Sequence, residues 1–162
     1  MDSEPASCPA LMSIRPEFAN RLLSGEKRVE FRRRPAARNV THILIYATSP
    51  ICAVVGVAEI ERLEHGTPEK LWRAFRLVGG IGRSDFFDYF ANADRGCAYV
   101  VRRIWPCTSP VPLGRKGLPS MAPQAFQYVR PSILEAVLSG IGHSARRGRR
   151  RIAPHLSSPT IG

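Results

Sequence analysis

The residues best suited to chemistry gather in one segment near the N-terminus. Lys27, Glu30 and Arg32 follow closely after Gly25. A lysine removed from water lowers its pKa and can act as a base or hold an oxyanion. Glutamate can accept hydrogen bonds from a base edge, and arginine binds phosphates through two parallel hydrogen bonds. The set predicts a catalytic or nucleotide-binding site, although simple ion pairing of Glu30 with Lys27 or Arg32 explains the same residues.

A predicted strand and helix lead the chain into this segment. An apolar strand over residues 11–14 precedes Pro16. The first turn of a helix tolerates proline because the missing N–H has no partner there. Apolar residues then recur at helical spacing over residues 17–24. Gly25 is the expected helix stop, because glycine takes a positive φ without strain.

A second strand is expected directly after the glycine turn. Apolar and charged residues alternate over residues 28–34, which predicts a half-buried strand with one charged face. Glu30 and Arg32 then share that face, and Lys27 lies at the mouth of the turn. We therefore expect the three side chains to line one cleft. Lys27→Ala is expected to abolish specific binding while leaving stability nearly unchanged, as surface substitutions usually do.

The remainder of the chain alternates strands with short helices. A long strand over residues 51–63 contains Gly56, which indicates a bulge or a sharp bend. Ser84 is expected to cap a short helix. The predicted fold class is α+β, a small mixed, mostly antiparallel β-barrel with flanking helices. The other expected elements are strands over residues 41–48 and 96–107, with proline-rich extended chain to 112, and helices opening at Thr67, over 86–91 and from Pro131.

Length and charge define the organisation and the partner class. The 162 residues suffice for one core, so we expect a flexible N-terminus over residues 1–9, a single domain over 10–141 and a disordered basic tail over 142–162, dispensable for folding. The net charge is +11. Single-stranded nucleic acid or a nucleotide is the expected partner. The excess of arginine over lysine fits phosphate binding, although GC-rich codon usage explains that ratio equally well.

Several classes of protein are not indicated by the sequence. The four cysteines lack metal-ligand spacing, so no metal site, cofactor or disulfide is expected. No apolar run approaches the roughly 20 residues of a membrane span. The N-terminus lacks the basic and apolar regions of a signal peptide. The expectation is a cytoplasmic protein, monomeric, without membrane contact.

Side chains outside the central segment extend the candidate site. The arginines around it could contact a phosphate chain, or could form a solvated basic face. Tyr46 could stack on a base, although aromatic residues in strands more often lie in the core. Gln124 could bind a base edge. The candidate nucleic-acid-binding residues are therefore Arg15, Lys27, Glu30, Arg32, Arg33, Arg34, Tyr46 and Gln124.

The ordered motifs resemble a known family. Gly25-Glu26-Lys27-Arg28-Val29-Glu30-Phe31-Arg32 is similar to the signature of the ASCH domain, a branch of the PUA-like superfamily. Val55-Gly56-Val57-Ala58-Glu59 resembles its central strand, and Pro123-Gln124-Ala125-Phe126 resembles its terminal element with Ala122 in place of the first proline. The resemblance covers about residues 11–130. It implies a PUA-like barrel with a cleft beside the signature.

The resemblance also implies association with RNA or DNA. One branch hydrolyses N-acetylated cytidine with the signature lysine, a threonine nucleophile three residues later and a downstream carboxylate, and nuclease activity is proposed for other members. Here the threonine position holds Glu30. Residues 78–84, where the carboxylate is expected, hold no acid, and Asp85 is assigned to the helix dipole. Lys27, Glu30 and Glu59 are the candidate catalytic residues.

Three functions remain open at this point. The first is a non-catalytic module that binds RNA or a modified nucleotide. The second is a hydrolase of an acylated nucleoside such as N-acetylcytidine, or a ribonuclease. The third is an adaptor whose barrel binds protein. The absent carboxylate argues against the acylated-nucleoside hydrolase, and the clustering of arginines around the signature favours the first function over the third.

Overall fold

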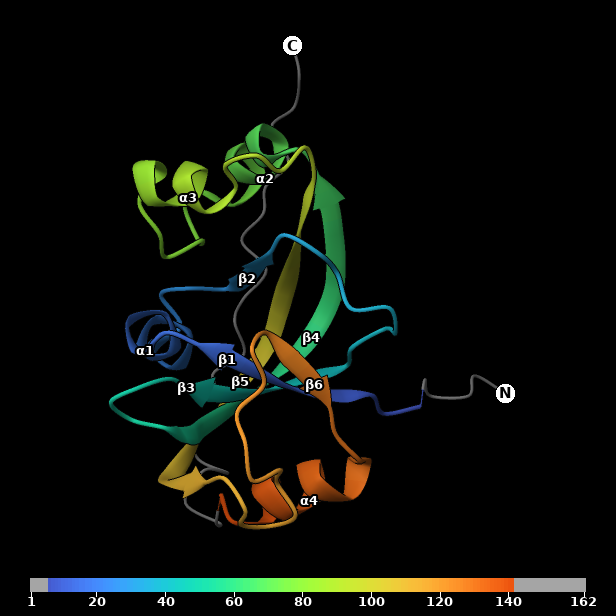
Figure 1. Cartoon of the computed structure of the whole chain (residues 1–162). Helices are drawn as coiled ribbons and strands as arrows, with labels where there is room; N and C mark the ends of the chain where they lie inside the picture. Colours follow the sequence, from blue (N-terminus) through green and yellow to red (C-terminus); the bar gives the residue numbers. More distant parts are fainter. Residues whose placement is uncertain (1–5, 142–162) are drawn as a thin grey trace.

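The computed structural model describes residues 6–141 as an α+β fold (Figure 1). This confirms the fold class expected from the hydrophobic periodicity. The elements in chain order are β1 (Pro9–Ile14), α1 (Pro16–Ser24), β2 (Val29–Arg32), β3 (His42–Ala47), β4 (Ala53–Gly66), α2 (Pro68–Phe75), α3 (Arg83–Tyr89), β5 (Gly96–Pro112), β6 (Phe126–Tyr128) and α4 (Pro131–Ser139).

All six strands belong to one curled sheet in the order β2-β5-β4-β3-β1-β6. β1 and β3 are parallel, and the other pairs are antiparallel. The long strands β4 and β5 bend together because their pairing slips at three places, one of them between Val54 and Gly56. The bend predicted at Gly56 is therefore confirmed. Within residues 6–141 the barrel remains a half-barrel, with β2 and β6 as its edges.

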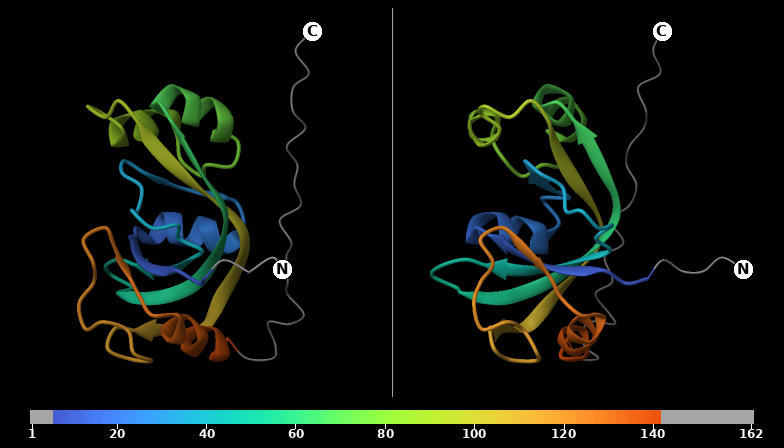
Figure 2. Two further views of the ribbon diagram at one scale, coloured as in Figure 1. Left: turned by 90° about the vertical axis from the view of Figure 1, so that its right-hand side faces the viewer. Right: turned by 45° about the vertical axis from the view of Figure 1, so that its right-hand side comes forward.

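The four helices cover different parts of the sheet, as the two views in Figure 2 show. α1 packs against β3 and β5 through Ala19 and Leu22. α2 and α3 form an aromatic cluster with the edge strand β2, in which Phe31 and Phe86 are fully packed. α4 closes the opposite end with Leu134 and Val137. The insertion between β4 and β5 thus folds back onto the segment that carries the signature.

Most element boundaries agree with the sequence-based expectations. Gly25 ends α1 at φ 83°, and the Thr67 hydroxyl caps α2. Several boundaries differ by two residues or more. β1 already begins at Pro9, β5 continues through the prolines to Pro112, and Gly82 rather than Ser84 is the N-cap of α3. The Ser84 assignment is wrong because the helix starts one turn earlier, after the glycine-rich loop.

Two further expectations concern the basic tail and membrane-spanning segments. The basic tail falls on residues 142–162, which lie outside the described residues. Among residues 6–141, no helix is both long and apolar enough to cross a membrane.

Gly56 is expected to be essential for the bend of β4. A Cβ atom there would lie 2.5 Å from Leu23 Cδ2 and 3.0 Å from the Trp105 carbonyl oxygen. Gly56→Ala should lower the free energy of unfolding by about 1–3 kcal/mol, because the Leu23 side chain must turn aside and the Trp105 backbone must give way. Gly66→Ala in the same strand is the control, since its Cβ would meet nothing closer than 3.4 Å. Equal melting temperatures for the two variants would contradict this account of the bend.

Candidate functional site

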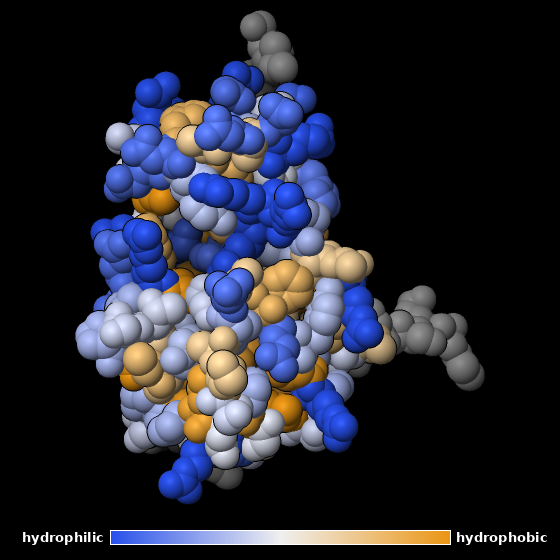
Figure 3. All heavy atoms as spheres, viewed as in Figure 1, coloured by the Kyte–Doolittle hydropathy of each residue, from blue (hydrophilic) through white to orange (hydrophobic). Residues whose placement is uncertain are grey.

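A cavity of about 680 Å³ lies between α1, β2 and α3. In Figure 3 the face seen in Figure 1 is hollowed here, and hydrophilic side chains surround the hollow. Four basic and four acidic side chains line the cavity, so its lining carries no net formal charge. The lining residues are Ser13, Ile14, Arg15, Glu17, Phe18, Lys27, Glu30, Phe31, Arg32, Arg33, Ile81, Asp85, Asp88 and Tyr89.

Lys27 lies at the floor of this cavity and not on an exposed turn. The residue is 3% exposed, and its Nζ donates a hydrogen bond of 2.8 Å to the Gly79 carbonyl oxygen. The ammonium also lies 4.9 Å from the centre of the Phe31 ring and 5.5 Å from that of Phe18. The expectation that Lys27 is a surface residue is therefore wrong. The insertion that buries it comes from a distant part of the chain.

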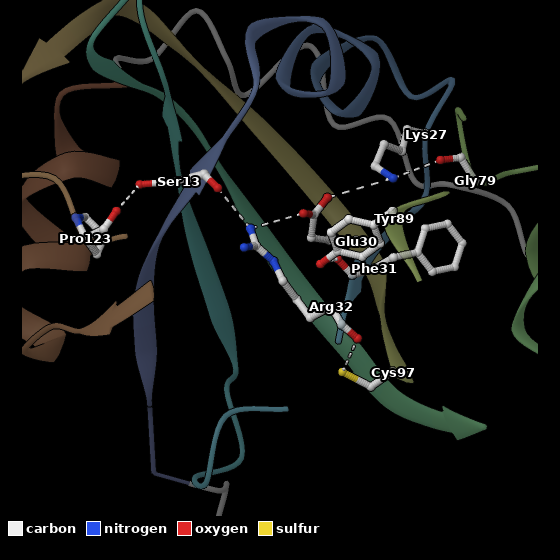
Figure 4. A network of polar contacts seen from close by, with 9 residues as sticks. All are labelled: Ser13, Lys27, Glu30, Phe31, Arg32, Gly79, Tyr89, Cys97 and Pro123. Carbon is white, nitrogen blue, oxygen red and sulfur yellow. Dashed lines mark hydrogen bonds and ion pairs between the residues drawn. The ribbon is translucent and has the colours of Figure 1, made fainter. Parts of the chain in front are cut away.

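Glu30 connects the two cations of the floor. One carboxylate oxygen lies 3.1 Å from Arg32 Nη2, and the other lies 3.8 Å from Lys27 Nζ (Figure 4). The residue is 8% exposed. The same Arg32 nitrogen donates to the Ser13 carbonyl oxygen at 3.0 Å, whereas Arg32 Nε is buried without a partner in the described part of the chain. A carboxylate acceptor and a free N–H donor therefore lie close together.

The glycine-rich loop before α3 forms the lid over the Lys27 stem. The backbone N–H of Arg28 donates to Val78, and the Arg21 guanidinium donates to the Gly80 carbonyl oxygen. A Cβ atom on Gly80 would lie 2.7 Å from Lys27 Cβ, so only glycine allows this close approach. The loop is thus tied to the signature segment through Arg28 and to α1 through Arg21, on either side of the Gly79 hydrogen bond.

The sequence-based analysis missed the contribution of α3. Asp85, Asp88 and Tyr89 line the cavity, while Phe86 and Phe90 of the same helix are buried in the core. Residues 78–84 hold no acid, as the sequence analysis states, but the assignment of Asp85 to the helix dipole alone is incomplete because its side chain lines the cavity. The spacing i, i+3, i+4 of the three polar residues indicates one helix face and could have revealed them.

The structure brings together only part of the predicted site. Arg15, Lys27, Glu30, Arg32 and Arg33 line the cavity. They converge because the end of β1, the start of α1 and strand β2 meet at its wall.

The remaining predicted residues lie outside the cavity. Tyr46 is 6% exposed in the core beneath α4, so its ring is not available for stacking on a base. Glu59 faces Arg102 and Arg103 of β5, at 3.9 and 3.7 Å, and is not part of the cavity lining, so it is not a catalytic candidate of this cavity. Arg34 is exposed beyond the end of β2. Gln124 is exposed in a loop that Ser13 anchors through bonds to its two neighbours.

The electrostatic setting of Lys27 favours a chemically active amine. Burial lowers the pKa of Lys27 below its ordinary value of 10.5; the neighbouring Glu30 carboxylate opposes this shift, and the Arg32 and Arg21 guanidinium groups add to it. Burial also raises the pKa of Tyr89. Among the residues that the structure describes, no cluster of three His, Cys, Asp or Glu side chains is arranged to hold a metal ion.

Comparisons with known proteins identify a family and a related protein of similar sequence. The model of the ASCH domain family matches residues 12–106. An "ASCH domain-containing ribonuclease" of Zymomonas mobilis is 35% identical over 107 residues, which are 65% of this chain and 72% of that protein.

Solved structures extend the comparison to the fold. The crystal structure of ASCH from Zymomonas mobilis has a TM-score of 0.72 at 30% identity, covering 81% of this chain and 94% of its own. The N-terminal domain of Staphylothermus marinus McrB has a TM-score of 0.52 at 13% identity, covering 86% and 98% of the two chains. That second likeness concerns the fold alone.

Removing the Lys27 ammonium should destabilise the fold. Lys27→Ala leaves Glu30 with one cation instead of two and opens space beneath Gly79 and Gly80. Breaking a buried ion pair on one side costs about 3–5 kcal/mol, so thermal unfolding should occur several degrees lower than in the parent protein. Lys70→Ala on the exposed side of α2 is the matched control and should unfold like the parent. If Lys27→Ala and Lys70→Ala have the same melting temperature, the buried contacts of Lys27 contribute nothing to stability.

Proposed function

Because the chain belongs to the ASCH domain family, we propose that it binds single-stranded RNA and places one nucleobase in the cavity between α1 and α3. The observation that carries this proposal is the buried Lys27–Glu30–Arg32 cluster at the floor of a cavity without net charge. Phosphate alone would favour an excess of cations. A mixed set of donors and acceptors suits the polar edge of a base.

The size and walls of the cavity are consistent with a nucleotide. Its volume of about 680 Å³ falls within the range of small-molecule sites, roughly 300–1,000 Å³. Phe18 and Tyr89 supply aromatic surface on two different elements of the wall. Aromatic rings beside polar groups are typical of proteins that take up single unstacked bases of RNA. The Zymomonas relative, described as a ribonuclease, supports RNA as the nucleic acid.

Removing charged side chains from water beneath the cavity costs free energy, and binding a base would account for their presence there. Glu30 and Arg32 are expensive to remove from water, and an apolar pair of similar volume often gives equal or greater stability. A carboxylate held in place by Arg32 is already oriented for the N–H groups of a base, so little rotational freedom is lost on binding.

Glu30→Gln should reduce discrimination between bases. The substitution keeps the shape of the side chain but replaces the anionic acceptor, so the preferred base should lose about 1–3 kcal/mol of its advantage over the others. Binding is measured by fluorescence anisotropy with single-stranded homopolymeric RNAs at fixed salt. Glu59→Gln makes the same chemical change outside the cavity and should leave the preferences unchanged. If both variants retain the parent's preferences, the base is not bound at Glu30.

Ribonuclease activity is a second candidate, favoured by the lowered pKa of Lys27. A neutral Lys27 amine could take the proton of a ribose 2′-hydroxyl, whose oxygen would attack the neighbouring phosphorus while the 5′ oxygen leaves. Arg32 and Arg33 would stabilise the charge on the phosphate. The leaving 5′ oxygen would take its proton from solvent at the mouth of the cavity. This candidate uses the same cavity and the same ligand class.

The pH dependence tests this second candidate. Cleavage by a neutral amine should increase with pH and level off above the pKa of Lys27, which lies below 10.5. Glu30→Gln removes the anion that raises this pKa, so its profile should rise at lower pH. The measurement is initial cleavage of a labelled single-stranded RNA across pH, with Lys27→Met as the inactive reference. Cleavage by Lys27→Met at the parent's rate would exclude Lys27 as the base.

A further inference from the structure

Two arginine side chains of the loop between β2 and β3 stack on tyrosine rings. The Arg33 guanidinium lies 5.0 Å from the centre of the Tyr89 ring, and Arg38 lies 4.8 Å from that of Tyr128. Tyr89 belongs to α3 at the cavity wall, whereas Tyr128 belongs to the edge strand β6. The loop therefore runs from the rim of the cavity across to the opposite edge of the sheet (Figure 1).

The charges of this loop are not neutralised by neighbouring acids. Within residues 6–141, no carboxylate lies within ion-pair distance of Arg33, Arg34 or Arg38, and all three residues are exposed. Arg62 and Arg103, in contrast, lie in ion pairs with glutamates of β4. The loop thus forms a positive surface next to a cavity whose lining is neutral.

The loop is held in place by contacts that do not need the Arg34 and Arg38 side chains. The Tyr99 hydroxyl accepts the Ala36 N–H at 2.8 Å, and the Tyr128 hydroxyl accepts the backbone N–H of Arg38 at 2.9 Å. Ala36 itself is buried in the core. The Arg38 guanidinium makes no hydrogen bond within the described residues and lies over the Tyr128 ring. The contact with the ring holds this cation at the surface of the loop before any ligand arrives.

We infer that the segment Arg33–Arg38 is a second RNA contact, which takes the nucleotides adjacent to the one in the cavity. This inference rests on the proposed function. If it is correct, the ligand of the protein is a polynucleotide and not a free nucleoside. Guanidinium and tyrosine planes are surfaces on which unpaired bases stack, and free guanidinium groups bind phosphates through paired hydrogen bonds. The neutral cavity selects a base, and the loop supplies the attraction for the phosphate chain.

The test compares two ligands of different length. Arg34→Ala/Arg38→Ala should bind a mixed-sequence single-stranded RNA about tenfold or more weakly, from lost stacking and phosphate contact. The slope of log affinity against log salt should fall by about 0.7 for each lost phosphate contact. Affinity for ribonucleoside 5′-monophosphates should stay unchanged, because these reach only the cavity. Arg73→Ala on α2 is the control, because it removes an exposed guanidinium that no acid among residues 6–141 pairs with.

Arg38→Lys separates the two contributions of that side chain. Lysine keeps the charge but lacks the planar group, so the salt slope should persist while affinity for RNA still falls. Parent-like affinity in both loop variants, or an equal loss for the monophosphates, would overturn the inference. If the parent binds RNA and Glu30→Gln alone alters binding, the inference fails and the proposed function stands. Absence of RNA binding by the parent would overturn both.

Discussion

The burial of one ammonium group determines how the parts of this structure are arranged. Lys27 Nζ is removed from water, and such a charge is tolerated only with close partners. Glu30 comes from the neighbouring strand, whereas the Gly79 carbonyl oxygen comes from a loop 52 residues later in the chain. This pairing fixes the α2–α3 insertion against β2. The cavity exists because α3 is thereby held opposite α1.

Two kinds of recognition are kept apart in this arrangement. The cavity floor offers a carboxylate, an ammonium and a guanidinium in a region of low dielectric constant. Hydrogen bonds are strong there, and a polar group left without a well-aligned partner is costly. The loop from Arg33 to Arg38 offers charge and flat surfaces in water, where the attraction is long-ranged and tolerant of sequence. A single-stranded chain can use both at once, because the loop begins at the cavity wall.

The sequence predicted what depends on neighbours along the chain. Gly25, Pro16 and Thr67 end or begin helices through local backbone geometry, and each does so here. Alternation in β2 correctly placed Glu30 and Arg32 together. The burial of Lys27 could not be predicted, since it depends on where a distant insertion folds back.

The same limit explains the misplaced residues. Periodicity gives the two faces of a strand but does not say which face another element covers. Tyr46 therefore lies under α4 and Glu59 lies beside two arginines of β5, although both alternate as expected for a strand. Asp85 was assigned to the helix dipole because the sequence does not say which way its helix turns the polar face, and the structure turns that face toward the cavity.

The chemistry at position 30 favours base recognition over covalent catalysis. The hydrolase branch that the signature resembles has a threonine nucleophile here, whose hydroxyl is neutral and free to attack. Glu30 is held at 3.1 Å by Arg32 and has Lys27 at 3.8 Å on its other oxygen. An attack by this carboxylate would give up both ion pairs in a buried site and would form an acyl anhydride. A hydrogen-bonded base, in contrast, uses the remaining lone pairs and leaves the ion pairs in place. Under the proposed function Glu30 is therefore the residue that recognises the base, and Lys27 is the one that any cleavage would use.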